Sequence, residues 1–182
     1  MMEIHPTPLK DCFYLKAPEF RDERGVFMET FHEKKFRDLT GLQAHFVQDN
    51  QSQSSKGVLR GLHFQKGAMA QAKLVRVALG KVLDIVVDLR KESPTFGNHF
   101  SIELSNENGI QFFVPRGFAH GFVTLSERSI FCYKCDNYYD KASESGIIYN
   151  DATLKLDWHL PEEELIISPK DLELPAFAEV IA

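Results

Sequence analysis

The chain has 182 residues, with 21 Lys and Arg against 26 Asp and Glu, which gives a formal net charge of −5. Hydrophobic residues make up 43% of the chain, an ordinary globular share that excludes a disordered protein. The net acidity argues against nucleic-acid or anionic-membrane binding, because those partners select a basic face. The first residues do not resemble a signal peptide, and no apolar run approaches the ~20 residues of a membrane helix. We therefore expect a cytoplasmic protein that binds neither nucleic acid nor membranes.

The sequence predicts a single domain over residues 1–182, because no repeat and no linker divides it. We expect an arm with one helix over residues 1–50, a core barrel over 51–140, and an extension over 141–182 that packs on the barrel. Most of 58–139 consists of short apolar or alternating runs separated by Gly, Pro, Asn and Ser. That rhythm is typical of an all-β sandwich or barrel.

Local patterns predict several elements in chain order. Residues 32–42 predict a helix, and the polar residues 48–57 predict a loop. Residues 79–82 fit a two-residue β-hairpin with glycine at its first central position. Residues 105–109 predict a longer loop, and the run of carboxylates after Pro161 predicts a short helix.

Positive charge is concentrated between residues 50 and 83, where there is no Asp or Glu. The six cations there give this stretch +6 and leave −11 for the rest of the chain. A solvated basic face would explain this pattern as well as a binding site would. Alternation along the predicted strand, however, puts Lys73 on the same face as Val75 and Val77, toward a barrel interior. A buried ammonium needs a partner or a task, so Lys73 is a candidate site residue.

His63 is a candidate for acid–base chemistry, although a single strand histidine is also often structural. It lies in the segment RGLHF, where strict alternation would put Arg60 and His63 on opposite faces. If both side chains serve one pocket, the strand must contain a bulge, and Gly61 is the natural place for it.

His120 and Tyr133 are further candidates because the strand pattern points both side chains inward. His120 alternates with Phe118 and Phe122, and Tyr133 shares its face with Phe131. An imidazole and a phenol at the end of apolar rows would both face the barrel interior.

Cys132-x-x-Cys135 has the spacing of a redox pair or of half a zinc site. Redox pairs of this kind begin helices, whereas this pair lies within a predicted strand, where side chains three apart face opposite ways. A zinc site would need two further ligands at comparable spacing, and the sequence offers none. With Cys12 there are three cysteines, too few for a secreted disulfide framework. We predict that they are structural.

The segment Pro115-x-Gly117-x-x-His120 resembles the second half-motif of the cupins, jelly-roll (double-stranded β-helix) proteins that often bind a metal. The first half-motif needs His-x-His followed by Glu, but the matching strand offers only His63. The resemblance therefore implies a mainly β, cupin-type jelly roll with a few short peripheral helices and no metal.

A more specific resemblance covers nearly the whole chain. Seven ordered segments are similar to the dTDP-4-dehydrorhamnose 3,5-epimerase family: 22–29, 46–50, 58–65, 73–76, 90–97, 117–125 and 137–139. The family converts dTDP-4-dehydro-6-deoxy-D-glucose to dTDP-4-dehydro-L-rhamnose through enolates, on the route to dTDP-L-rhamnose and O-antigen. No cofactor is implied.

The resemblance also implies the chemical roles. His63 is the base, and Asp171 is the carboxylate that fixes its tautomer and raises its basicity. Tyr133 is the acid on the opposite face of the sugar, and Lys73 stabilises the enolate oxygen.

Substrate binding and assembly are implied in the same way. Arg60 would bind the diphosphate, and Tyr139 would stack on thymine. The other implied substrate contacts are Lys73 and Arg24, Phe27, Glu29, Gln48, Asp49, Asn50, His120, Glu144 and Lys170. The family further implies a homodimer in which the N-terminal segment around Arg24 reaches the neighbouring active site.

Several alternatives share this fold. A 3- or 5-epimerase, or a ketoisomerase of dTDP-4-keto sugars, would use a related base and enolate. A metal-dependent cupin dioxygenase would need bound iron, and a non-catalytic sugar-binding cupin would leave Lys73 and Tyr133 unexplained. The full set of His63, Tyr133 and Asp171 favours the double epimerase.

Overall fold

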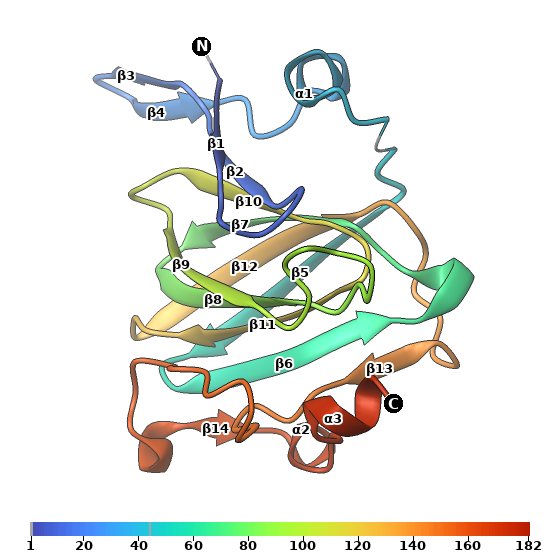
Figure 1. Ribbon diagram of the computed structural model, residues 1–182. Coiled ribbons are helices and arrows are strands. Elements are labelled where there is room, and N and C mark those ends of the chain that lie inside the picture. The colour runs from blue at the N-terminus through green and yellow to red at the C-terminus, as the bar shows by residue number, and fades with distance from the viewer. Residues whose placement is uncertain (1, 44) are drawn as a thin grey trace.

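The computed structural model describes residues 2–43 and 45–182, and it confirms the predicted mainly β class (Figure 1). Two sheets lie face to face with a hydrophobic core between them. The first sheet is antiparallel and has the strand order β1 (Glu3–Pro6), β2 (Phe13–Lys16), β10 (Ile110–Val114), β7 (Lys73–Leu79), β12 (Arg128–Cys135) and β5 (Gln48–Ser55).

The second sheet and the peripheral elements complete the fold. Its strand order is β13 (Glu144–Gly146), β6 (Val58–Gln65), β11 (Phe118–Thr124), β8 (Lys81–Asp88) and β9 (His99–Ser105), with β14 (Ile166–Ile167) parallel to β6. Strands β3 (Glu19–Asp22) and β4 (Gly25–Met28) form a separate hairpin that projects from the body of the molecule (Figure 1). The helices are α1 (Glu33–Thr40), α2 (Pro169–Leu172), α3 (Phe177–Val180) and the 3-10 turns η1 (Gly67–Met69) and η2 (Glu162–Glu164).

The second sheet is covered on both faces, which explains why every residue of β11 is buried. On β8, Val82 and Val86 point into the core between the sheets, whereas Leu83, Ile85 and Val87 belong to the core under the C-terminal segments. This alternation is the period-2 geometry of a strand between two apolar layers. It also fixes which face of β8 each remaining side chain must occupy.

The predicted helix at residues 32–42 is confirmed as α1. Its buried Phe36 packs with Phe13 and Phe113 on the outer face of the first sheet. The helix ends at Gly41, whose φ of 72° is a left-handed conformation that glycine favours. The short helix predicted after Pro161 is the 3-10 turn η2. None of the helices in residues 2–43 and 45–182 is long and apolar enough to cross a membrane.

The loop predicted at residues 48–57 is wrong, because Gln48–Ser55 form strand β5. This strand pairs antiparallel with β12 from Gln48↔Cys135 to Ser55↔Arg128. Its polar composition does not indicate a loop, since its side chains border solvent and a cavity between the sheets rather than the apolar core.

The hairpin predicted at residues 79–82 is also wrong. Strand β7 pairs with β10 and β12, whereas β8 pairs with β11 and β9, so the chain crosses from one sheet to the other at Gly80. Gly80 has a φ of 79°, and a Cβ there would lie 2.0 Å from the carbonyl oxygen of Arg128. The glycine permits a close crossing between sheets instead of a hairpin turn.

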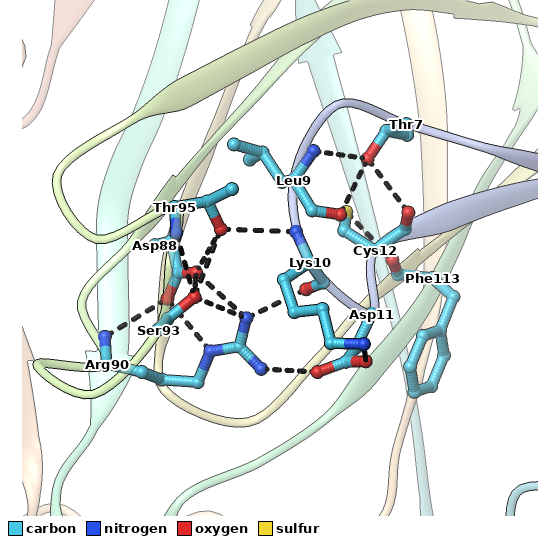
Figure 2. A network of polar contacts seen from close by, with 10 residues as sticks. All are labelled: Thr7, Leu9, Lys10, Asp11, Cys12, Asp88, Arg90, Ser93, Thr95 and Phe113. Carbon is cyan, nitrogen blue, oxygen red and sulfur yellow. Dashed lines mark hydrogen bonds and ion pairs between the residues drawn. The ribbon is translucent and has the colours of Figure 1, made fainter.

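A polar cluster joins the turn between β1 and β2 to the loop after β8 (Figure 2). We call it the Arg90 clamp; it consists of Lys10, Asp11, Asp88, Arg90, Ser93 and Thr95. The Arg90 guanidinium donates to Asp88 at 2.8 Å through both Nε and Nη2, to Asp11 Oδ2 at 2.9 Å and to the Lys10 carbonyl at 2.8 Å. The Ser93 and Thr95 hydroxyls donate to Asp88 Oδ2 at 2.6 and 2.7 Å. Burial alone would raise the pKa of Asp88, but these hydrogen bonds lower it to about 2.

Candidate active site

A cavity of about 530 Å³ lies between β5, β7 and β12 of the first sheet and β6 and β11 of the second. Residues 166–171 close one side of it. The cavity brings together seven of the side chains that the sequence singled out: Arg60, His63, Lys73, His120, Tyr133, Lys170 and Asp171.

His63 and Asp171 form a hydrogen-bonded pair at the edge of this cavity. The imidazole Nε2 lies 2.7 Å from Asp171 Oδ1, which leaves Nδ1 as the ring nitrogen available to a ligand. Asp171 is in α2, where its backbone N–H donates to the N-cap Ser168, and the Gly61 N–H donates to its Oδ2 at 3.3 Å. Burial opposes ionisation, but the hydrogen bonds and charge of His63 outweigh it and lower the pKa of Asp171. An ionised Asp171 fixes the tautomer and the orientation of the His63 ring.

Arg60 and His63 both line the cavity although they are three residues apart on one strand. The register between β6 and β11 shifts between His120 and Phe122, which is the irregularity that the sequence predicted next to Gly61. Gly61 has a φ of 125°, and a Cβ there would lie 2.6 Å from the Cα of Gly121. The two glycines therefore allow the strands to approach closely where the functional side chains must share a face.

Arg60 is fixed on one side only. Its Nε donates to Ser54 Oγ at 3.2 Å. The terminal nitrogens Nη1 and Nη2 make no hydrogen bond to any part of the chain that the structure describes. They are available to bind an anion, which suits a diphosphate.

Lys73 and Tyr133 lie on the first sheet, opposite His63. The Lys73 ammonium is 5.9 Å from the centroid of the Tyr133 ring, and both residues line the cavity. Burial lowers the pKa of Lys73 and raises that of Tyr133. The phenol therefore keeps its proton at neutral pH, as an acid requires.

His120 forms a second pair with Asp84. The sequence predicts His120 as a site residue but does not identify Asp84 as its partner. Nε2 of His120 lies 3.0 and 2.9 Å from the two oxygens of Asp84, whose exposure is 0%. Burial raises the pKa of Asp84, although His120 opposes this shift. The available signal was the position of Asp84 between Val82 and Val86, on the inward face of β8.

Four other predicted residues lie around an adjoining recess of about 120 Å³, which shares His63, Lys73 and Tyr133 with the cavity. The Tyr139 hydroxyl and the Lys170 ammonium donate to the same oxygen of Glu144, at 2.9 and 2.7 Å. The residues from the predicted set that line this recess are Gln48, Asn50, Tyr139 and Glu144.

The structure does not bring the last four predicted residues to the cavity of the same chain. Arg24 pairs with Asp22 in the β3–β4 hairpin, Glu29 pairs with Lys35, and Asp49 pairs with Lys134. Phe27 lies in the same hairpin and is 69% exposed.

A metal centre has no evident ligand set. Within residues 2–43 and 45–182 there is no group of three or more His, Cys, Asp or Glu that could hold an ion. Cys12, Cys132 and Cys135 are free thiols, and burial raises the pKa of Cys135 to about 11. That the reaction needs neither a metal nor a cofactor stays a prediction.

Paired acid–base groups in a cavity between two facing β-sheets define an enzyme of the jelly-roll class that moves protons on a bound ligand. The model of the dTDP-4-dehydrorhamnose 3,5-epimerase family matches residues 6–179. The chain belongs to this family and is therefore an isomerase with the cupin jelly-roll fold.

Three 3,5-epimerases illustrate the similarity, which extends over nearly the whole of each chain. The dTDP-4-dehydrorhamnose 3,5-epimerase of Salmonella typhimurium is 48% identical, with 100% of this chain and 98% of that protein covered. The crystal structure of the enzyme from Elizabethkingia anophelis is 56% identical with a TM-score of 0.95, covering 100% of this chain and 99% of its own. The crystal structure of a Legionella pneumophila 3,5-epimerase in complex with dTDP-4-keto-L-rhamnose is 45% identical with a TM-score of 0.93. The match covers 97% of this chain and 93% of the Legionella chain.

Proposed function

We propose that this isomerase inverts C3 and C5 of dTDP-4-dehydro-6-deoxy-D-glucose and so makes dTDP-4-dehydro-L-rhamnose. The observation that carries the proposal is the His63–Asp171 pair on one side of the cavity and Tyr133 with Lys73 on the other. The Legionella complex with a dTDP-4-keto sugar supports the substrate class.

The base acts first. Nδ1 of His63 removes the proton from a carbon next to the C4 ketone, and the electron pair of that C–H bond forms a carbon–carbon double bond as charge moves to the ketone oxygen. Asp171 stabilises the imidazolium that results. The Lys73 ammonium lies on the opposite wall and stabilises the enolate oxygen.

The acid then acts from the other face. The Tyr133 phenol gives its proton to the same carbon, which inverts the configuration and restores the ketone. Its position on β12, in the sheet opposite that of His63, supports this division of roles. Because C3 and C5 flank the same ketone, one base, one acid and one oxyanion site serve both inversions, once solvent has taken the proton from His63 and returned a proton to Tyr133.

The nucleotide would occupy the cavity mouth and the adjoining recess. The free end of Arg60 and the ammonium of Lys170 suit the diphosphate, and Tyr139 offers an aromatic face 54% exposed for thymine. Gln48, Asn50, Glu144 and His120 supply further polar contacts around the same space.

We assign the N-terminal segment around Arg24 to the active site of a neighbouring subunit. The β3–β4 hairpin exposes Phe20, Val26 and Phe27 by 60%, 48% and 69%. Aromatic side chains so exposed on a projecting hairpin suit burial against a second copy. A homodimer would let Arg24, Phe27 and Glu29 contact the substrate of the partner. We further propose that the reaction takes place in the cytoplasm and contributes to cell-surface carbohydrates such as O-antigen.

Solvent labelling tests this function. The enzyme is incubated with the 4-keto substrate in deuterated water, and deuterium at each carbon is measured by NMR. We expect label at both C3 and C5 of an inverted product. Label at one carbon only would instead identify a single-carbon epimerase, and binding without any exchange would identify a non-catalytic cupin.

A further inference from the structure

Two histidine–aspartate pairs face one cavity, and the mechanism above uses only one of them. His63 on β6 and His120 on β11 are directly opposite in the strand register, so the two imidazoles are cross-strand neighbours on one face. Their carboxylates come from different directions. Asp171 belongs to the segment that closes the cavity, whereas Asp84 lies on the adjacent strand β8, opposite Phe122 in the register, and its carboxylate contacts His120.

We propose that Asp84 is a positioning residue that shares one proton with His120, so that Nδ1 of His120 carries a hydrogen and donates it to the C4 oxygen of the substrate. This inference rests on the proposed epimerase function and adds a second oxyanion donor beside Lys73. His120 thereby becomes a catalytic residue, and Asp84 acts only through it.

The geometry at Asp84 supports a shared proton. Both carboxylate oxygens face the same ring nitrogen, Nε2 of His120, at 3.0 and 2.9 Å. In the part of the chain that the structure describes, this is the sole hydrogen-bond partner of the Asp84 side chain. A fully buried carboxylate with one hydrogen-bond partner is costly in its charged form, and this cost favours a proton on one member of the pair.

Either position of that proton gives the same result at the cavity. If it lies on the imidazole, both ring nitrogens carry hydrogens. If it lies on the carboxyl, the carboxyl donates to Nε2 and the neutral ring has its hydrogen on Nδ1. In both cases Nδ1 is a donor. Nδ1 makes no hydrogen bond within residues 2–43 and 45–182, and His120 lines the cavity.

The surrounding charges are consistent with a donor at this position. Burial raises the pKa of Asp84, which favours retention of a proton by the pair. The charged or titratable groups that line the cavity with His120 are His63 and Arg60 from β6, Lys73 from β7, Tyr133 from β12, and Lys170 and Asp171 from α2. Among these, His63 is the neighbour that removes the substrate proton, so His120 lies close to where the enolate charge develops.

The C4 oxygen is common to the two inversions, and this gives the inference a specific kinetic consequence. Loss of the His120 donor should slow proton removal at both C3 and C5, by similar factors. Removal of one oxyanion donor typically costs about 10²–10³-fold in rate. A change in substrate placement would instead affect the two carbons differently.

Asp84→Leu, His120→Gln and the double variant are compared by solvent exchange at C3 and C5. We expect Asp84→Leu to slow both exchanges similarly, by about 10²-fold, with the double variant no slower than His120→Gln alone. The matched control is Thr124→Val, which breaks another buried pair, Thr124 with Ser129 at 2.8 Å, away from the cavity. It should lower the melting temperature and leave exchange unchanged.

A second measurement does not depend on Asp84→Leu folding. In the wild-type protein labelled with ¹⁵N-histidine, the His120 signals are assigned by their absence in His120→Gln, and we expect a proton on Nδ1 from pH 6 to 8. A bare Nδ1, or wild-type exchange rates in folded Asp84→Leu, would overturn the role of Asp84. A wild-type enzyme without exchange at either carbon would contradict the epimerase function itself, which separates the two failures.

Discussion

Asp171 in the cavity and Asp88 in the Arg90 clamp are both almost inaccessible, at 4% and 0% exposure, and both have a lowered pKa. Their partners differ. Asp88 is held by a permanent cation and two hydroxyls, whereas Asp171 is held by an imidazole with a free nitrogen at a cavity. The first arrangement can only stabilise the fold, and the second can also move protons. Neighbouring groups, rather than burial or pKa direction, therefore separate a structural carboxylate from a catalytic one.

The largest effect that this comparison predicts is for His63→Ala. Loss of the base removes proton abstraction at both carbons, so we expect kcat to fall by about 10²–10⁴-fold or more. The measurement is solvent exchange together with product formation. Thermal unfolding is measured alongside, because the change also leaves the buried Asp171 carboxylate without its imidazole partner and should lower the melting temperature of a protein that still folds. Turnover near the wild-type level would remove His63 from the mechanism.

Tyr133→Phe should separate the two halves of the reaction. The base is intact, so protons still leave the substrate, but the acid on the opposite face is gone. We expect inversion to fall by about 10²–10⁴-fold while exchange with solvent falls less. Deuterium incorporation without inversion is the diagnostic product. An equal loss of exchange and inversion would show that Tyr133 positions the substrate instead of protonating it.

The sequence was sufficient for most of the fold and for the cavity side chains. Alternation along short strands is a local signal, so it predicted the β class and pointed Lys73, His120 and Tyr133 inward, where the structure places them. The predicted distortion beside Gly61 is confirmed by the register shift between β6 and β11. The glycine that permits this distortion can be identified from the local sequence alone.

Features that depend on the pairing of distant strands were not predictable in the same way. The polar sequence of β5 predicts a loop, but its side chains border a cavity that the two sheets create together. The residues around Gly80 predict a hairpin, because the local sequence does not show that β7 and β8 belong to different sheets. Alternation along β8 indicates that Asp84 points inward. Its role becomes clear only from its hydrogen bond to His120 on the neighbouring strand β11.

Asp88→Asn tests whether the carboxylate in the Arg90 clamp stabilises the fold without a role in catalysis. The folded-state pKa of Asp88 is about 2 against an ordinary value of 3.8, so its ionised form stabilises the fold. This contribution is present above the unfolded pKa and is lost as the pH falls through about 2. We expect the variant to lower the free energy of unfolding by about 2 kcal/mol at pH 7. Urea unfolding at several pH values should show the difference shrink in acid, while kcat is unchanged.

The smallest effect is expected for Asp11→Asn, at the outer edge of the same clamp. Asp11 accepts from Arg90 Nη1 at 2.9 Å, but its side chain is 49% exposed, and water and salt screen the pair. The expected loss in the free energy of unfolding is therefore below about 1 kcal/mol and smaller still at high salt. Urea unfolding of Asp11→Asn, Asp88→Asn and the double variant measures it. Because both carboxylates bind one guanidinium, the two losses should not add. Strict additivity would mean that the two carboxylates stabilise the fold independently and that the clamp is not one coupled network.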